Sequence, residues 1–130
     1  MSFKIVFMGT PRFAIPILKS IYNSSHKILE VYSQPPQKKN RGQKVQNSPI
    51  HNFANDLNIP VRCPVSFEGS EEIEHIQKLK PDFVVVVAYG KILPSQLLNL
   101  KNTTFLNVHA SLLPKLRGAA TIQRAIMNKD

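Results

Sequence analysis

Short apolar runs alternate with amphipathic segments along the whole chain. Runs rich in β-branched residues and bounded by polar ones are typical of strands buried on both faces of a parallel sheet. On this basis we expect strands at residues 3–8, 27–33, 59–62, 83–88 and 103–110. The run at 83–88 (Phe-Val-Val-Val-Val-Ala) is the most strongly apolar and predicts a central strand.

Between these runs, apolar residues recur three or four positions apart, as on one face of a helix. Helices are expected at residues 11–22, 48–57 and 118–128, and after Ser70. Pro16 delays the regular part of the first helix, while Ser48-Pro49 is a favourable helix start. Ser70 is expected to cap its helix, whose first turn holds Glu71, Glu72 and Glu74 at the positive end of the helix dipole.

Alternation of strands and helices predicts the α/β class, with a doubly wound, mostly parallel sheet. The 130 residues suit one domain, but the pattern ends on a helix with no strand after it. We therefore expect residues 1–130 to be the N-terminal part of a larger domain, truncated before that domain is complete. Its last strand would keep an unpaired apolar edge, which predicts marginal stability or aggregation of the isolated piece.

Composition narrows the class of protein further. Hydrophobic residues make up 42% of the chain, and no apolar run is long enough for a membrane helix. The first apolar run is too short for a signal peptide and reads as a buried strand. Cys63 is the single cysteine, so an internal disulfide is excluded. These features favour a cytoplasmic protein with no membrane contact.

Basic residues dominate two long segments of the chain. The formal net charge is +9, and residues 31–55 and 83–129 hold no acidic residue. The first segment includes a polar loop at 34–47 that carries Lys38, Lys39, Arg41 and Lys44. One interpretation is a solvated surface kept for solubility; the other is contact with a polyanion. Because this loop follows the second strand, it overhangs the carboxyl edge where open α/β sheets bind ligands, which favours RNA contact.

The residues most suggestive of catalysis are Asn107 and His109. Side chains alternate along a strand, so these two share one face near the strand's carboxyl end. An imidazole can accept a proton from an attacking amine, and an amide can donate to an oxyanion, which suits acyl or formyl transfer. A lone histidine in a strand is more often a hydrogen-bonded core residue. Two polar residues on one face at a strand end favour the catalytic interpretation.

Other motifs carry weaker signals. Gly9-Thr10-Pro11 follows the first strand, but the glycine fingerprint of dinucleotide-binding proteins is missing. His26, His51, His75 and Cys63 show no metal-ligand spacing, so we interpret them as surface or core residues and expect no metal.

Several segments together resemble one family. They are Phe7-Met8-Gly9-Thr10-Pro11-Arg12-Phe13-Ala14, Ser33-Gln34-Pro35, Arg41-Gly42-Gln43-Lys44, Ser48-Pro49, Val87-Ala88-Tyr89-Gly90-Lys91-Ile92-Leu93-Pro94, Asn107-Val108-His109-Ala110-Ser111-Leu112-Leu113-Pro114 and Arg117-Gly118-Ala119-Ala120-Thr121-Ile122-Gln123. In this order the chain resembles the methionyl-tRNA formyltransferases, a branch of the folate-dependent formyltransferases. The resemblance implies a Rossmann-like formyltransferase fold.

The resemblance also implies roles for individual residues. Asn107 and His109 match the catalytic amide and imidazole, and residues 89–94 match a wall of the pterin pocket. Arg41 and Lys44, with Lys38 and Lys39 beside them, match the loop that reaches tRNA. The tetrahydrofolate-binding stretch corresponds to Ser111, Leu112, Leu113 and Pro114.

The sequence departs from the family's pattern at some positions. Pro36 replaces a usual aspartate, residues 37–40 replace an arginine- and proline-containing stretch, and Thr121 replaces a proline. These changes leave the path of the loop open. The family's catalytic aspartate and its C-terminal tRNA-binding barrel would lie beyond Asp130, so we expect the isolated piece to be inactive.

The implied reaction transfers a formyl group from 10-formyltetrahydrofolate, the co-substrate, to the amino group of methionyl-initiator-tRNA in translation initiation. A monomeric enzyme is expected. Two alternatives remain open: a sibling enzyme that formylates an amino sugar or glycinamide ribonucleotide, and a non-catalytic fragment that binds RNA or folate. Siblings lack the basic insertion and depart from the Arg-Gly-Ala-Ala segment, which favours the first reaction.

Overall fold

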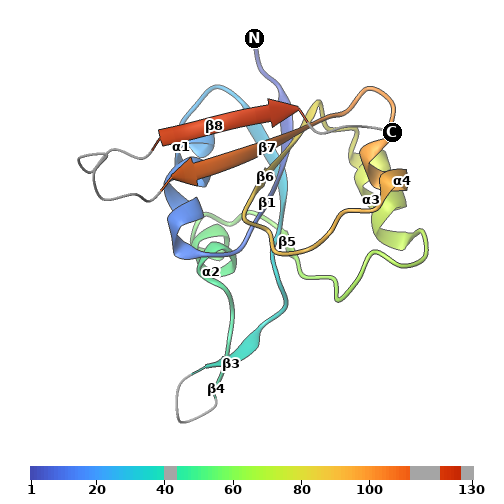
Figure 1. Ribbon diagram of the computed structural model, residues 1–130. Coiled ribbons are helices and arrows are strands. Elements are labelled where there is room, and N and C mark those ends of the chain that lie inside the picture. The colour runs from blue at the N-terminus through green and yellow to red at the C-terminus, as the bar shows by residue number, and fades with distance from the viewer. Residues whose placement is uncertain (40–43, 112–120, 127–130) are drawn as a thin grey trace.

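The computed structural model describes residues 1–39, 44–111 and 121–126. Its main feature is a sheet in the order β5-β2-β1-β6-β7-β8 (Figure 1). The strands are β1 (Lys4–Gly9), β2 (Lys27–Tyr32), β5 (Val61–Arg62), β6 (Phe83–Val87), β7 (Thr104–Ser111) and β8 (Thr121–Ile126). All neighbours pair in parallel except β7 and β8, which are antiparallel. The strands expected from the sequence and the doubly wound, mostly parallel arrangement are confirmed.

Helices cover both faces of the sheet, as a doubly wound fold requires. Helices α1 (Ile15–Tyr22) and α2 (Pro49–Asp56) lie on one side, and α3 (Glu71–Leu79) and α4 (Ser95–Leu98) on the other (Figure 1). Leu18 and Ile50 bury the first pair against Phe7, while Ile76 and Leu97 bury the second pair against Phe105. The short helix α4 was not expected from the sequence.

The helix starts mostly follow the local sequence signals. A 3-10 turn, η1 (Arg12–Ala14), precedes α1, so the regular helix begins next to Pro16 as predicted. The Ser48 hydroxyl accepts a hydrogen bond from the His51 backbone amide, which confirms it as the cap of α2. Ser70 occupies the N-cap position of α3, which begins at Glu71 as predicted, but its side chain makes no capping hydrogen bond.

Residues expected to form only a loop contain a small hairpin. Strands β3 (Gln37–Lys39) and β4 (Lys44–Gln46) pair antiparallel and project away from the sheet (Figure 1). Ser33 precedes this hairpin and Ser48 follows it. Their hydroxyls, both buried, are hydrogen-bonded to each other and so join the two ends of the hairpin. Lys38, Lys39 and Lys44 therefore lie on paired strands.

The end of the chain differs most from the sequence prediction. Where we expected a helix at 118–128, residues 121–126 form β8. This strand pairs with β7 over a register from Leu106↔Ile126 to Ser111↔Thr121, so β7 does not have the unpaired edge that we expected. The physical reason is that the free edge of β7 offers unsatisfied backbone groups, and the threonine and isoleucines of this segment are well suited to an extended strand.

The segments with candidate functional residues lie at one edge of the sheet. In a parallel sheet all carboxyl ends meet at the same edge. The residues that follow β1, β2 and β6 therefore lie near the end of β7, which holds His109 and Ser111. Among the described residues, no helix is long and apolar enough to cross a bilayer.

Candidate active site

The polar pair Asn107 and His109 lies within β7, where this strand passes the carboxyl end of β6, and forms a direct contact. Asn107 Nδ2 lies 3.0 Å from His109 Nε2. Val108 between them is buried on the opposite face, in the core formed with α1 and α2. Because an amide nitrogen only donates, Nε2 of the imidazole is the acceptor in this contact. The predicted shared face of Asn107 and His109 is confirmed.

The surroundings leave this pair accessible. His109 is exposed and Asn107 half-buried. Together they border a cavity of about 310 Å³ whose other walls come from η1 and from the end of β6 and the loop after it. The remaining lining residues are Phe13, Val86, Ala88, Tyr89, Gly90, Lys91 and Val108. A base and a hydrogen-bond donor thus face one small space at the sheet edge where α/β proteins bind ligands.

A tight backbone path after β6 shapes one wall of this cavity. Ala88 has φ 50° and Gly90 φ 88°, both in the left-handed region. Glycine adopts that conformation without strain, whereas for alanine it costs free energy and must be held by its surroundings. Two hydrogen bonds hold it: Thr10 Oγ1 donates to the Tyr89 carbonyl at 2.8 Å, and Gln34 Nε2 to the Gly90 carbonyl at 2.7 Å. Of the segment predicted at 89–94, residues 89–91 line the same cavity as Asn107 and His109.

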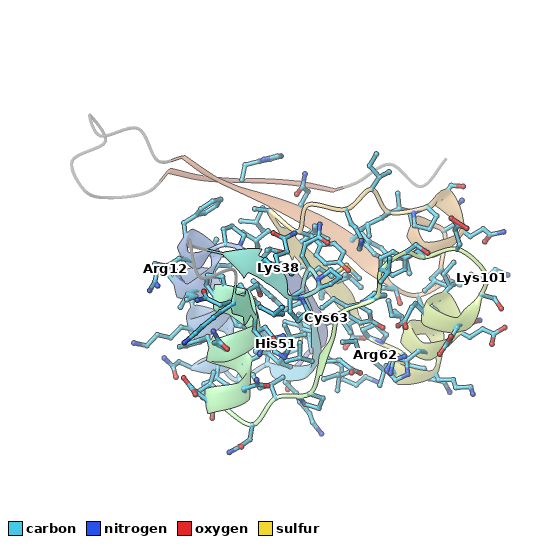
Figure 2. The ribbon with its side chains drawn as sticks, turned by 90° about the horizontal axis from the view of Figure 1, so that it is seen from below. Arg12, Lys38, His51, Arg62, Cys63 and Lys101 are labelled. Carbon is cyan, nitrogen blue, oxygen red and sulfur yellow. The ribbon has the colours of Figure 1, made fainter. Side chains whose placement is uncertain are left out.

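The predicted tRNA and folate residues are only partly placed. Lys38 and Lys44 are exposed on the two strands of the hairpin, which Figure 2 shows for Lys38, and Lys39 ends β3. Ser111 is the last residue of β7. Arg41, Leu112, Leu113 and Pro114 lie outside the described residues. The structure thus leaves the roles of all of them as predictions.

A second polar cluster lies away from the cavity and was missed by the sequence analysis. Arg62 at the end of β5 forms an ion pair with Glu72 of α3, with Nε 2.8 Å and Nη2 3.0 Å from its carboxylate oxygens. Tyr32 of β2 donates to the same carboxylate at 3.0 Å. Next to it, His75 Nε2 lies 2.7 Å from Glu30 Oε1. These contacts fasten α3 to β2 and β5.

The charges of this cluster shift the ionisation of its members. Hydrogen bonding from Arg62 lowers the pKa of Glu72 below its ordinary value, with Tyr32 acting in the same direction. Burial raises the pKa of the Tyr32 phenol, and the Glu72 carboxylate raises it further. Glu72 is therefore ionised and Tyr32 neutral near pH 7. Each of these side chains has a hydrogen-bonding partner within the cluster, which indicates a stabilising network.

Cys63 and His51 make a further contact between β5 and α2. The Cys63 sulfur lies 3.5 Å from His51 Nδ1, and Figure 2 labels both. Burial raises the pKa of the thiol and lowers that of the imidazole, so both are neutral and no thiolate–imidazolium nucleophile forms. Within the described residues, no group of three or more histidines, cysteines and carboxylates lies close enough to hold a metal ion.

Three larger hollows lie elsewhere among the described residues. One of about 720 Å³ lies at the amino ends of the strands, next to Lys4 and Asp82. Another, about 540 Å³, is an apolar depression between α1 and β7 that includes Ile17, Ile21 and Leu106. A third, about 530 Å³, lies next to Arg62 and His75. None of them is lined by Asn107 or His109. Volume alone therefore does not identify the functional site, whereas convergent polar groups do.

An open, mostly parallel sheet with an amide–imidazole pair at its carboxyl edge is the arrangement of an α/β protein, with side chains suited to acyl transfer. Residues 3–130 match the formyl transferase family, and the chain belongs to that family.

The relatives refine this assignment. The methionyl-tRNA formyltransferase of Pelagibacter ubique is 56% identical over 131 residues, covering 100% of this chain and 42% of the relative. That of Parvibaculum lavamentivorans is 51% identical over 127 residues, covering 98% and 41%. The chain thus spans about two fifths of the length of these relatives.

A solved structure confirms the fold. The phosphoribosylglycinamide formyltransferase from Bacillus halodurans superposes with a TM-score of 0.64 and 17% sequence identity, covering 98% of this chain and 73% of that one. The expected Rossmann-like formyltransferase fold is therefore confirmed.

Proposed function

We propose that this chain carries the catalytic edge of an enzyme that moves a formyl group from 10-formyltetrahydrofolate to the amino group of methionyl-initiator-tRNA, in translation initiation. The observation that carries the proposal is the Asn107–His109 pair facing a cavity of about 310 Å³. Relatives about half identical to this chain bear the name methionyl-tRNA formyltransferase, which supports this acceptor over those of sibling enzymes.

The chemistry assigned to the pair is addition followed by elimination. The amine nitrogen of the acceptor attacks the formyl carbon, a new C–N bond forms, and the carbonyl oxygen becomes an oxyanion. Asn107 Nδ2 has one hydrogen directed at His109 and a second free to donate to that oxyanion. As the amine approaches, His109 Nε2 gives up the hydrogen bond from Asn107 and accepts the proton lost by the amine. It returns that proton to the leaving nitrogen of tetrahydrofolate as the old C–N bond breaks.

The donor fits the character of the cavity. Ala88 and Gly90, which are exposed, line the cavity together with the aromatic residues Phe13 and Tyr89, a lining that suits a flat heterocycle. Ser111, which ends β7, and the segment Leu112, Leu113 and Pro114 that follows it would border the rest of the folate. When bound, the donor supplies the activated formyl group, and the protein supplies orientation and proton transfer.

The acceptor is proposed to lie along the hairpin. Lys38 and Lys44 project from its two strands, with Lys39 and Arg41 between them in the sequence. Phosphate attraction would bring the acceptor stem against this edge. Within this proposal residues 1–130 are the N-terminal part of a formyltransferase catalytic domain, in a monomeric cytoplasmic enzyme whose tRNA-binding barrel lies outside this chain.

Transfer of a labelled formyl group tests the proposal. A version of the protein with the full length of its relatives is incubated with labelled 10-formyltetrahydrofolate and, separately, methionyl-initiator-tRNA, glycinamide ribonucleotide or an amino sugar nucleotide. We expect label on the tRNA alone, and none with residues 1–130 by themselves. Label on a small acceptor would favour a sibling activity, and binding of tRNA or folate without transfer would favour a non-catalytic protein; either result contradicts the proposal.

A further inference from the structure

Three loops at the carboxyl edge are joined through a single side chain. Thr10, which follows β1, donates its hydroxyl to the Tyr89 carbonyl at 2.8 Å and accepts from the Gln34 backbone amide at 3.3 Å. Its own carbonyl accepts from the Ile50 amide, in the first turn of α2, at 3.3 Å. Thr10 therefore contacts the loop after β6, the segment that leads into the hairpin and the helix that follows the hairpin.

Gln34 adds a second bond between the same loops. Its Nε2 donates to the Gly90 carbonyl at 2.7 Å. The approach is close: a Cβ added to Gly90 would come within 2.9 Å of Gln34 Nε2, and Gly90 has φ +88°. Gly90 is therefore restricted both by its backbone conformation and by this side chain. The segment that leads into the hairpin is therefore connected to residues 89–90 of the cavity lining in two ways: through the Thr10 hydroxyl and through the Gln34 side chain.

We infer that Thr10 and Gln34 are positioning residues, which fix the orientation of the β3–β4 hairpin relative to the cavity that holds Asn107 and His109. The inference rests on the proposed function, in which the hairpin contacts the tRNA and the cavity receives the formyl donor. Neither residue touches the reacting atoms in this role. Each acts by holding the acceptor-binding element at a set distance from the donor-binding wall.

The rest of the hairpin shows why these bonds matter. Its strands pair only with each other in a separate two-stranded sheet. Isolated hairpins are marginally stable, and this one projects from the body of the protein (Figure 1). The hairpin is attached where the chain enters and leaves it. The Ser33 and Ser48 hydroxyls join these two points, and Thr10 and Gln34 connect the entry point to the loop after β6. Loss of the latter bonds would let the hairpin pivot while it stayed folded.

A distance measurement tests the attachment directly. Spin labels are placed at Val45 on the hairpin, 64% exposed, and at Ile92 beyond the cavity wall, 95% exposed, in a full-length version that carries Cys63→Ser. We expect a single narrow distance distribution in this parent and a wider or shifted one in Thr10→Val and Gln34→Ala. Thr10→Ser keeps the hydroxyl and should restore the narrow distribution. Gln77→Ala, an exposed change on α3, is the matched control.

Kinetics on the same variants separate positioning from binding. Because misplacement by about 1 Å can cost on the order of 10²-fold in rate, we expect kcat to fall roughly 10- to 100-fold in Thr10→Val and Gln34→Ala. The KM for tRNA should change less, since the hairpin lysines are intact, and Thr10→Ser should recover the parent kcat. Gln34 is partly exposed, so Gln34→Ala carries the test if Thr10→Val fails to fold.

The outcomes distinguish this inference from the function on which it rests. Unchanged distance distributions, or unchanged kcat in Gln34→Ala while His109→Ala abolishes transfer, would overturn the positioning role and leave the proposed function standing. A parent protein that transfers no formyl group would overturn the proposed function. The distance measurement would still decide whether Thr10 and Gln34 hold the hairpin.

Discussion

Two histidines of this chain have close polar partners but very different surroundings. His75 lies 2.7 Å from the carboxylate of Glu30, whose side chain is 9% exposed, and belongs to the cluster that fastens α3 to the sheet. His109 is exposed at a strand end and lies 3.0 Å from an amide. By partner alone, the carboxylate-bound His75 would be the better catalytic candidate, since carboxylates commonly orient catalytic imidazoles.

The difference lies in what each imidazole can still reach. His75 also borders a hollow, but it directs Nε2 at Glu30, and its neighbour Glu72 is occupied by Arg62 and Tyr32. His109 faces a cavity that residues of the loop after β6 also border. A polar pair in a packed cluster stabilises the fold, whereas a pair at the carboxyl edge of a parallel sheet is free to meet a ligand. Location in the fold therefore separates the two roles better than the chemical type of the partner.

The largest predicted effect compares these histidines directly. In a full-length version, His109→Ala should lower turnover by at least the 10²- to 10³-fold typical of one lost transition-state interaction, because the proton acceptor is gone. His75→Ala should change turnover much less and instead lower the melting temperature. Formylation assays and thermal unfolding of both variants would measure this. A loss of turnover in His75→Ala equal to that in His109→Ala would contradict the different roles assigned to the two histidines.

Removal of the oxyanion donor should have the next largest effect. Asn107→Ala is expected to lower kcat by about 10²- to 10³-fold, the scale of one lost oxyanion hydrogen bond, with little change in the KM for tRNA. Asn52→Ala, at an exposed position on α2, is the matched control and should retain the parent kcat. Steady-state kinetics distinguish the two, and an unchanged kcat in Asn107→Ala would refute its assigned role.

Salt dependence tests the basic hairpin. If Lys38, Lys39, Arg41 and Lys44 all meet phosphates of a duplex stem, log affinity should fall with log salt at a slope of about −3 to −4. Neutralising all of them should flatten the slope toward that of the remaining surface. Fluorescence titrations of tRNA at several salt concentrations give the slope. A slope that is the same with and without these residues would remove the hairpin from the tRNA interface.

The smallest effect concerns the stabilising cluster and its pH dependence. Glu72→Gln should lower the free energy of unfolding by roughly 1–3 kcal/mol at pH 7, since it removes charge-assisted hydrogen bonds. The pKa of Glu72 is lower in the folded state than its ordinary 4.5. Its contribution is therefore present above that value and is lost as the pH falls through the folded pKa.

Urea unfolding at neutral pH and below pH 4 would measure this effect in both proteins. We expect the difference between the parent and Glu72→Gln to shrink at the lower pH, while turnover at pH 7 stays close to that of the parent. A difference that persists undiminished in acid would mean that the charge of Glu72 contributes nothing.

The parts of this account that the sequence could predict are local. The strand runs, the Ser48 cap and the shared face of Asn107 and His109 all follow from spacing within a few residues. Strand alternation alone brings the two catalytic candidates together. Their place at the ligand edge followed from their position at the end of a predicted strand.

Contacts between distant residues could not be predicted in this way. Gln34 meets Gly90, and Glu30 meets His75, only because β2, β1 and β6 are adjacent in the sheet and α3 packs over β2. No periodicity in the sequence encodes that adjacency. The helix predicted over residues 121–126 was wrong for another reason. The residues there fit either a helix face or a strand, and pairing with the open edge of β7 selects the strand.

The most direct test of the central claim is the crystal structure of a full-length version with a non-transferable analogue of 10-formyltetrahydrofolate. We predict that the formyl oxygen lies about 2.7–3.1 Å from Asn107 Nδ2, the distance expected for an oxyanion donor. The approach path of the amine should then pass His109 Nε2. A formyl group bound elsewhere, such as in the apolar hollow between α1 and β7 or beside His75, would contradict the account.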